Sequence, residues 1–191
     1  CSGVKLPLIV PQLPLFVLGA GSNVLAPDGE YVGVVLNISI VGKEVVVEEG
    51  TNSVLYSVGA GEDLDTIIAD TVASGWWGME NLSAIPSSIG AVPVQNVGAY
   101  GVEASQLITS VRVYNGETTQ IETWTASQCQ FAYRDSIFKH EAGRRAIVLA
   151  VTFRLSLTPT PRLTYKDLAE YFGDTIPTQN AIRAAIITIR G

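Results

Sequence analysis

The sequence has few of the residues that bind metal ions, and little charge. Its 191 residues include two cysteines, one histidine and one methionine, and only 16% are Asp, Glu, Lys or Arg. Cys1 and Cys129 form no spacing motif, and His140 is the only histidine, so no Cys/His metal site can be assembled. We therefore expect two free thiols and no metal.

A basic surface is also lacking, because the formal net charge is -6. Broad electrostatic capture of nucleic acid or of an anionic membrane needs a basic face, so neither is expected as a partner. An anionic ligand would have to be held locally. Backbone amides in glycine-rich loops and a few placed Arg or Lys side chains can do this inside an acidic protein.

No long unbroken hydrophobic run is present. The longest apolar stretch, residues 4–18, contains Lys5, Gln12 and three prolines, so it is not expected to span a membrane as a helix. A secretory signal peptide is the alternative interpretation of this stretch, but the stretch has no basic start and no small-residue cleavage site. A cytoplasmic location is therefore expected. Since the first residue is not Met, we expect a fragment, a processed chain or one that lacks its first residues.

What remains is apolar enough to fold, with 47% hydrophobic residues and 18 glycines spread between short elements. Strands are predicted over residues 15–18, 31–40, 45–47, 54–58, 111–114, 119–124 and 146–155. A helix is predicted from its N-cap Asp63 to Gly75, and others over 166–172 and from Thr178 onward. The inward face of the last is predicted to comprise Ile182, Ala185, Ile186 and Ile189. Asn115-Gly116 predicts a two-residue hairpin turn, because this pair supplies positive φ angles.

The first candidate binding segment is the glycine-rich run at residues 19–25, which follows a predicted strand. Its backbone N–H groups can converge on a phosphate, and Ser22 and Asn23 can add donors. The run lacks the third glycine of the dinucleotide fingerprint and no helix clearly follows it, so a Rossmann site is disfavoured. Taken alone, it is equally well explained as a tight turn between strands.

The second candidate segment, residues 78–101, shows neither helical nor strand periodicity and contains four glycines. Long irregular segments inside a compact domain are uncommon and tend to carry function, so a structured binding loop is predicted. Gln95 and Asn96 offer amide groups suited to ring edges and ribose hydroxyls. The two segments together predict a long ligand with a diphosphate and a ring.

Three motifs are specific enough to compare with a known family: GAGSNVL at 19–25, NLSAIPSSIGAVPVQNVGAYG at 81–101 and YRDSIFK at 133–139. In the same order, they resemble motifs of the UDP-N-acetylenolpyruvoylglucosamine reductase family. The resemblance covers the chain from about residue 15 to its end, and the second and third motifs are the most specific.

The resemblance implies an α+β fold, an FAD-binding domain of the vanillyl-alcohol-oxidase (PCMH) type. In this fold two α+β subdomains clamp the flavin and a substrate domain comes after them. The implied division is a first subdomain in 1–75, a second in 76–155 and the start of the substrate domain in 156–191, with both ends incomplete. The residues implied to bind FAD are Gly19, Ala20, Gly21, Ser22, Asn23, Val24, Ile85, Pro86, Ser87, Ser88, Gly90, Ala91, Pro93, Gln95, Asn96, Gly98, Ala99, Tyr100 and Gly101.

The implied activity is the reduction of UDP-N-acetylenolpyruvoylglucosamine to UDP-N-acetylmuramate in peptidoglycan precursor synthesis, with NADPH reducing the flavin. Arg134 matches the family's catalytic arginine, whose guanidinium fork suits a substrate carboxylate. Tyr133, Arg134 and Tyr165 are implied to contact the substrate. A surface ion pair with Asp135 or Glu141 is the alternative role for Arg134, and packing in the core is the alternative for both tyrosines.

Parts of the sequence depart from the family pattern. Ser87 lies where the family commonly has glycine and Ala91 where it commonly has glycine or serine, and the sequence ends before the family's motif that carries a proton-donating serine. We therefore expect this chain to bind flavin without completing the reaction; a non-catalytic FAD or nucleotide-sugar binding fragment is the alternative. Lys139 and His140 are predicted to be rim residues, since nothing in the sequence places a carboxylate to orient His140.

Overall fold

The computed structural model describes residues 13–190, so Cys1 and residues 4–12 of the apolar stretch lie outside the described residues. Cys129 is a free, buried thiol, and burial raises its pKa to about 11. It is therefore protonated at neutral pH. Among the helices of residues 13–190, none is both long and apolar enough to cross a membrane.

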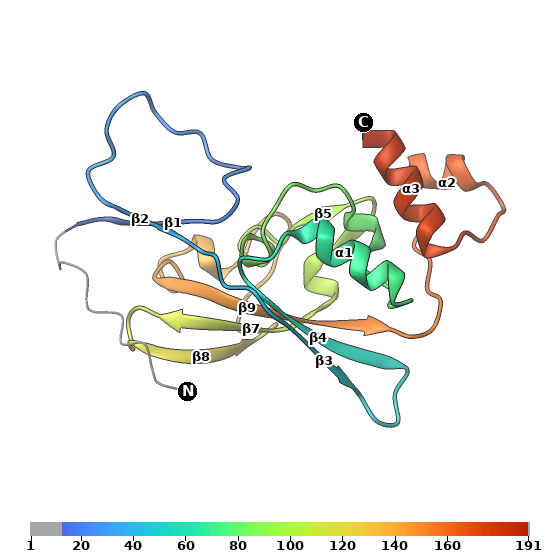
Figure 1. Cartoon of the computed structure of the whole chain (residues 1–191), viewed down its shortest axis with the longest axis horizontal. Coiled ribbons are helices and arrows are strands. Elements are labelled where there is room, and N and C mark those ends of the chain that lie inside the picture. The colour runs from blue at the N-terminus through green and yellow to red at the C-terminus, as the bar shows by residue number, and fades with distance from the viewer. Residues whose placement is uncertain (1–12, 191) are drawn as a thin grey trace.

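A five-stranded antiparallel sheet forms the centre of the molecule, with the strand order β3-β4-β9-β7-β8 (Figure 1). Its strands are β3 (Lys43–Val47), β4 (Ser53–Gly59), β7 (Ile108–Asn115), β8 (Gln120–Thr125) and β9 (Ala146–Ser156). In β4, Val54, Tyr56 and Val58 are buried while the residues between them are half-exposed. This alternation places one face of the sheet in the core, as the period of two along the sequence predicts.

Helix α1 (Leu64–Ala73) contributes the other side of the core through Leu64, Ile67 and Ile68, which are fully buried. Its start is the predicted N-cap, since the Asp63 carboxylate accepts the Thr66 backbone N–H at 2.8 Å. Gly75 comes after the end of the helix with a φ of +73°, a left-handed conformation that glycine adopts without strain. The sequence prediction of this helix is confirmed at both ends.

The segment after α1 is a structured loop, as predicted. It contains three single-turn 3-10 helices, η1 (Glu80–Leu82), η2 (Ile89–Ala91) and η3 (Ala104–Gln106), and the two-stranded pair β5 (Gly98–Ala99) and β6 (Val102–Glu103). Leu64 N–H donates to Ser87 O at 2.9 Å, and Gly90 N–H donates to Ala60 O at 2.7 Å. These bonds fix the second glycine-rich segment against the junction between β4 and α1.

Strands β1 (Leu15–Leu18) and β2 (Val34–Asn37) form a separate parallel pair, and much of the loop between them projects away from the central sheet (Figure 1). The predicted strand 31–40 is shorter in the structure. Before it, a tight turn forms in which Gly33 N–H donates to Tyr31 O at 3.0 Å. A Cβ at Gly33 would lie 2.6 Å from Pro14 O, so the close approach of these two segments of the chain requires glycine.

The prediction of a two-residue turn at Asn115-Gly116 is wrong. Asn115 pairs with Gln120, which leaves the four-residue loop 116–119, and Thr119 has the positive φ of 57°. The Asn115 carboxamide oxygen accepts the Glu117 N–H at 3.0 Å and so closes the longer loop. Gly116 is needed for another reason, because a Cβ there would lie 2.8 Å from Arg145 O.

Strand pairing bears on the two predicted domain boundaries. β3 and β4 lie before residue 75 but belong to the same sheet as β7, β8 and β9, and residues on both sides of this boundary share one core. β1 and β2 form a sheet of their own. The second predicted boundary, after residue 155, lies just before the end of β9 at Ser156. The division of the chain into domains stays a prediction.

Helices α2 (Lys166–Phe172) and α3 (Gln179–Arg190) end the described chain and pack around a second, smaller apolar cluster. Its buried residues are Trp77, Leu168, Ile182, Ala185 and Ile186. The predicted inward face of α3 is thus confirmed except at Ile189, which is 37% exposed because the end of the helix runs beyond the cluster.

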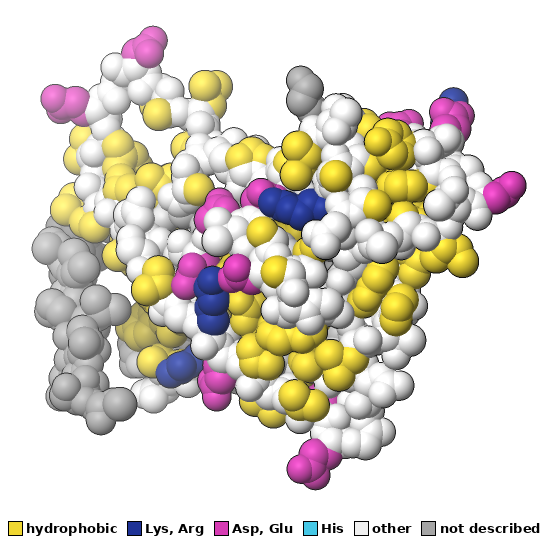
Figure 2. All heavy atoms as spheres, turned by 45° about the vertical axis from the view of Figure 1, so that its right-hand side comes forward, with side chains coloured by type: hydrophobic (Ala, Val, Ile, Leu, Met, Phe, Trp, Pro, Cys, Tyr) yellow, Lys and Arg dark blue, Asp and Glu magenta, His cyan; other side chains and the backbone are white. Residues whose placement is uncertain are grey.

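On the face in Figure 2, basic side chains lie beside acidic ones and form no continuous basic patch.

Two leucines on the last strand and just beyond it test this account of the core. Leu155 is fully buried, whereas Leu157 is 42% exposed. We expect Leu155→Ala to lower the free energy of unfolding by about 2–5 kcal/mol, because it leaves a cavity in the core. Leu157→Ala should change it by about 0.5 kcal/mol or less. Urea unfolding measures both, and equal losses would contradict the assigned core.

Candidate functional site

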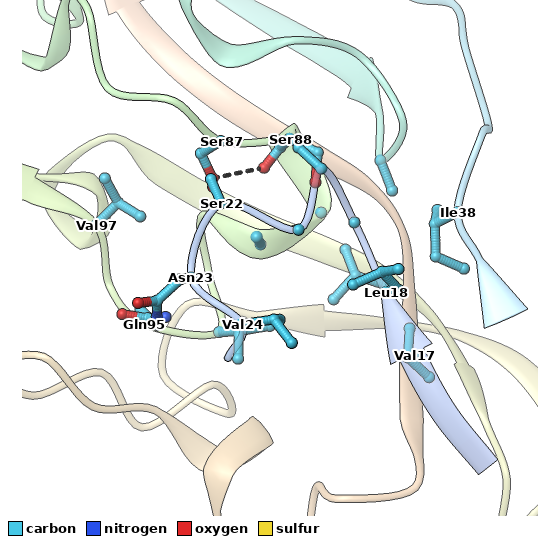
Figure 3. Close-up of a pocket in the computed structure, with 18 of the residues that line it drawn as sticks. Val17, Leu18, Ser22, Asn23, Val24, Ile38, Ser87, Ser88, Gln95 and Val97 are labelled. Carbon is cyan, nitrogen blue, oxygen red and sulfur yellow. Dashed lines mark hydrogen bonds between the residues drawn. The ribbon is translucent and has the colours of Figure 1, made fainter. Parts of the chain in front are cut away.

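A cavity of about 710 Å³ lies between the two glycine-rich segments, in the size range of small-molecule sites. Figure 3 shows the loop of residues 19–24 facing the segment that carries Ser87, Ser88, Gln95 and Val97. Most of the residues predicted from the sequence line it: Gly19, Ala20, Gly21, Ser22, Asn23, Val24, Ile85, Pro86, Ser87, Ser88, Gly90, Ala91, Gln95, Gly98 and Arg134.

The two segments touch at one end of this cavity. The Ser22 hydroxyl donates to the backbone carbonyl of Pro86. Gly19 passes so close to Ser88 that a Cβ at position 19 would overlap the Ser88 hydroxyl. The first loop can therefore reach the second only because residue 19 is glycine.

Several hydrogen-bond donors at this end have no partner. The backbone N–H groups of residues 19–23 donate to no other residue that the structure describes. The Ser88 side chain is buried, at 5% exposed, and its hydroxyl has no hydrogen-bond partner within residues 13–190. Successive free amides beside a buried, unpartnered hydroxyl make a concavity suited to an anion such as a phosphate.

The charge around the cavity is positive although the protein is acidic. Arg134, Arg144 and Arg190 line it, and the described lining residues include no Asp or Glu. Arg144 and Arg190 were not predicted from the sequence, because neither belongs to a recognisable motif. The lining also includes apolar side chains from distant elements, among them Val17, Ile38 and Val148. The cavity thus offers donors and positive charge beside an apolar wall.

Arg134 lies at the tip of a tight turn. Ala132 and Asp135 exchange two backbone hydrogen bonds, of 3.0 and 3.1 Å, and Arg134 has a φ of +55°. This left-handed conformation costs a non-glycine residue about 1–3 kcal/mol, so it needs support from its surroundings. The Lys139 ammonium donates to Arg134 O at 2.9 Å, and the Ser136 hydroxyl donates to Val94 O at 2.7 Å. These bonds fix the turn to the loop that lines the cavity.

The Arg134 guanidinium points to the same loop, where its Nη2 donates to Gly98 O at 2.7 Å. Within residues 13–190 it forms no ion pair with Asp135 or Glu141, so the surface ion pair considered from the sequence is absent there. A guanidinium has five N–H donors, and most of those of Arg134 remain available to a ligand in the cavity.

The expectation that no carboxylate orients His140 is wrong. Its Nε2 lies 2.7 Å from Asp135 Oδ2, across the single-turn helix η4 (Ile137–Lys139). The hydrogen bond from His140 lowers the pKa of the Asp135 carboxyl, with smaller contributions from the backbone N–H of Ser136 and from the charges of His140 and Lys139. His140 and Lys139 are exposed and neither lines the cavity, as predicted for rim residues.

Asn96, predicted to offer its amide to a ligand, faces the protein instead. It is 1% exposed, and its amide donates to Glu103 Oε2 and Ala132 O, each at 2.9 Å. Its carbonyl oxygen accepts the Ser105 N–H at 2.9 Å. Because both amide donors are used internally, we assign Asn96 to the fold of the loop.

Four further predicted residues lie outside the cavity lining. Pro93 is buried, and Ala99, Tyr100 and Gly101 form the tip of the β5–β6 hairpin, where Tyr100 and Gly101 have positive φ angles of 48° and 80°. The Tyr100 ring packs edge-on against Tyr165, with centroids 5.2 Å apart. The hairpin thus connects the cavity loop with the residues before α2.

The two tyrosines predicted to contact substrate do not line the cavity and are not in the core. Tyr133 is 80% exposed beside Arg134, whose guanidinium carbon lies 5.8 Å from the centre of the Tyr133 ring. Tyr165 is 44% exposed at the N-cap of α2. Core packing, the alternative considered for both residues, is therefore excluded by the structure.

The sequence matches a family described as FAD binding domain over residues 11–123. It is 40% identical over 185 residues to UDP-N-acetylenolpyruvoylglucosamine reductase of Alcanivorax borkumensis, an alignment that covers 94% of this chain and 52% of the relative. It is 44% identical over 181 residues to the reductase of the same name from Cupriavidus pinatubonensis, covering 93% and 52%. The chain thus spans about half the length of the curated relatives it matches.

Solved structures show the same fold. UDP-N-acetylenolpyruvylglucosamine reductase from Thermus caldophilus aligns with a TM-score of 0.65 and 23% identity, covering 94% of this chain and 57% of that one. Cholesterol oxidase from Brevibacterium sterolicum, as its His121Ala mutant, aligns with a TM-score of 0.54 and 19% identity, covering 75% and 30%. With the family match, these alignments confirm the predicted α+β FAD-binding fold and FAD as the cofactor.

Gln95 and Asn96 are neighbours in the sequence, but only Gln95 lines the cavity, so replacing each tests which side chain supports the fold. We expect Asn96→Ala to lower the free energy of unfolding by about 1–3 kcal/mol or more, because it leaves buried groups without partners. Gln95 lines the cavity. Gln95→Ala should therefore change stability by about 0.5 kcal/mol or less. Thermal and urea unfolding compare the two, and a stable Asn96→Ala protein would contradict the structural role.

Proposed function

Because the chain belongs to the FAD-binding domain family, we propose that it is the cofactor-holding portion of an NADPH-dependent reductase of UDP-N-acetylenolpyruvoylglucosamine. The product would be UDP-N-acetylmuramate, made in the cytoplasm for peptidoglycan precursor synthesis. The proposal is supported by two reductases that match nearly the whole chain. The structural observation that carries it is the cavity of free donors and arginines, whose described lining has no carboxylate.

The residues present fit FAD. The free amides of residues 19–23 and the Ser88 hydroxyl would hold the diphosphate, because this end of the cavity carries the unpartnered donors. The Ser22 hydroxyl, which donates to Pro86 O, lies at the same end. Gly90 lets the second loop approach Ala60, where a Cβ would lie 2.9 Å from the Ala60 side chain. The apolar wall would pack against a ring. When bound, the flavin supplies the chemistry of hydride transfer.

Arg134 is the proposed catalytic residue of this chain. Its guanidinium is held at the cavity by Gly98 O and by a supported turn, so little reorganisation is needed when a carboxylate binds. A fixed guanidinium stabilises negative charge that grows on a substrate carboxylate during reduction of the neighbouring double bond. Tyr133 and Tyr165 are proposed substrate contacts from outside the cavity, since both are exposed and each packs beside a residue of the loops described above.

Binding of FAD is the direct test. Titration of the purified chain, followed by flavin fluorescence, should show non-covalent binding of FAD in preference to NAD. Gly19→Ala should weaken FAD binding roughly three- to tenfold, because the added methyl displaces the Ser88 hydroxyl from the cavity. Gly29→Ala is the matched control, since a Cβ at Gly29 meets nothing within 4 Å. A chain that bound no flavin at high micromolar concentration would refute the proposal.

The role of Arg134 can be measured in a complete reductase that carries the YRDSIFK motif. Replacement of the matching arginine by Lys should cost about 3 kcal/mol or more of transition-state stabilisation, because one ammonium cannot replace the guanidinium fork. Flavin occupancy should stay near normal. Stopped-flow measurement of flavin reoxidation by the enolpyruvyl substrate gives the rate, and absorbance gives the occupancy. Parallel loss of flavin and rate would show that the arginine is structural.

A further inference from the structure

Helix α3 packs against the elements that lead into the cavity loop. Its buried residues Ile182 and Ile186 form an apolar cluster with Trp77, which stands just before η1. Figure 1 shows α3 at the end of the molecule near α1, beyond the central sheet. Apart from this apolar contact, the α3 side chains of Gln179 and Arg183 hydrogen-bond to residues of the cofactor-binding part, and Arg190 at the end of α3 lines the cavity.

Arg183 makes the stronger of these links. Its Nη1 and Nη2 donate to Asp65 Oδ1 and Oδ2 at 2.5 and 2.7 Å, a bidentate pair in which the Arg183 side chain is 17% exposed. Such a pair fixes both the position and the rotation of the carboxylate. The pKa of Asp65 is lowered, first by the hydrogen bond from Arg183 and then by the backbone N–H of Ala84, against the opposing effect of burial.

The fixed carboxylate in turn holds the start of the cavity loop. Asp65 Oδ1 accepts the Ala84 N–H at 2.7 Å. Ala84 has a φ of +58°, a left-handed conformation that an alanine adopts only when its surroundings require it. The next two residues, Ile85 and Pro86, line the cavity, and Pro86 O accepts the Ser22 hydroxyl of the first loop. The direction in which the loop enters the cavity therefore depends on the Asp65 carboxylate.

Gln179 makes a second link to the same segment. Its amide donates to Trp76 O at 2.8 Å and to Glu80 Oε2 at 3.3 Å. Glu80 is 1% exposed and also accepts the Gly78 N–H at 2.7 Å. The Gln179 amide thus contacts the chain on both sides of Gly78, in the segment that leads into the loop 84–88.

We propose that Arg183 is a positioning residue for the cofactor site, which couples the docking of α3 to FAD affinity through Asp65 and the left-handed Ala84. This inference rests on the assignment of the cavity to FAD. When α3 is docked, the loop 84–88 is held in the form that contacts Ser22. When the Arg183–Asp65 pair is lost, Asp65 no longer has a fixed rotamer and Ala84 can leave its strained conformation. By linkage, FAD binding also stabilises the docked helix.

The first test is FAD titration of Arg183→Met and Asp65→Asn chains. We expect each to bind FAD about tenfold more weakly, and the double variant to be no weaker than the worse single one, because both break one pair. Arg183→Lys should restore part of the affinity, since it keeps the charge but not the bidentate geometry. FAD affinity of Arg183→Met within twofold of the unaltered chain would overturn the proposal.

Two control variants separate positioning from a general loss of stability. Lys43→Met removes the exposed pair with Asp70 on the same helix α1, and Leu155→Ala removes a buried side chain from the core. Both should bind FAD within about twofold of the unaltered chain below their unfolding transitions, since neither side chain is hydrogen-bonded to Asp65 or Ala84 within residues 13–190. If the two control variants lost as much FAD affinity as Arg183→Met, the arginine would act through stability alone.

A measurement without ligand separates the coupling through Arg183 from the assignment of the cavity to FAD. Hydrogen exchange of the Ala84 amide in the FAD-free chain should be faster in Arg183→Met and unchanged in Lys43→Met, because the bond to Asp65 protects this amide. Unchanged exchange in Arg183→Met would overturn the coupling whatever the cofactor. If the unaltered chain did not bind FAD, the cofactor assignment would fall, and the exchange experiment would still decide whether Arg183 fixes this loop.

Discussion

The site depends on the backbone hydrogen bonds that fix the second glycine-rich segment to the junction of β4 and α1. Gly90 N–H donates to Ala60 O at 2.7 Å, Ile89 N–H to Glu62 O at 2.9 Å and Leu64 N–H to Ser87 O at 2.9 Å. The segment is thereby held at the edge of the core by α1 and the central sheet. Its serines and glycines consequently have fixed positions against which the first loop can close, and binding need not order them.

The electrostatics of the cavity depend on local arrangement and not on overall composition. A protein of net charge -6 repels anions at long range, but screening limits this effect to about 10 Å at ordinary salt. Inside the cavity, free amides and three arginines dominate because they lie within contact distance of a ligand and the described lining has no carboxylate. An anionic cofactor can therefore be held by a protein whose overall charge is negative.

Much of the fold was predictable because the relevant interactions are local. The strands β4 and β9 and the capping residues around α1 depend on neighbours within a few positions, and these predictions are confirmed. The Asn115-Gly116 turn was mispredicted because the Asn115 side chain and the approach of Arg145, just before β9, favour a longer loop. The strand order was not predicted, because pairing between strands that lie far apart in the sequence cannot be read from periodicity.

The sequence by itself determined the elements, the buried faces and the two loops that meet at the cavity, because motif and period report short-range chemistry. The tertiary structure decided which side chains face the ligand. Gln95 lines the cavity while Asn96 is used internally, and Arg144 and Arg190 join Arg134 from distant segments. These assignments depend on distances between parts of the chain that lie tens of residues apart. Hydrogen bonds and charge pairs act over a few ångströms, so only the folded chain determines which of them form.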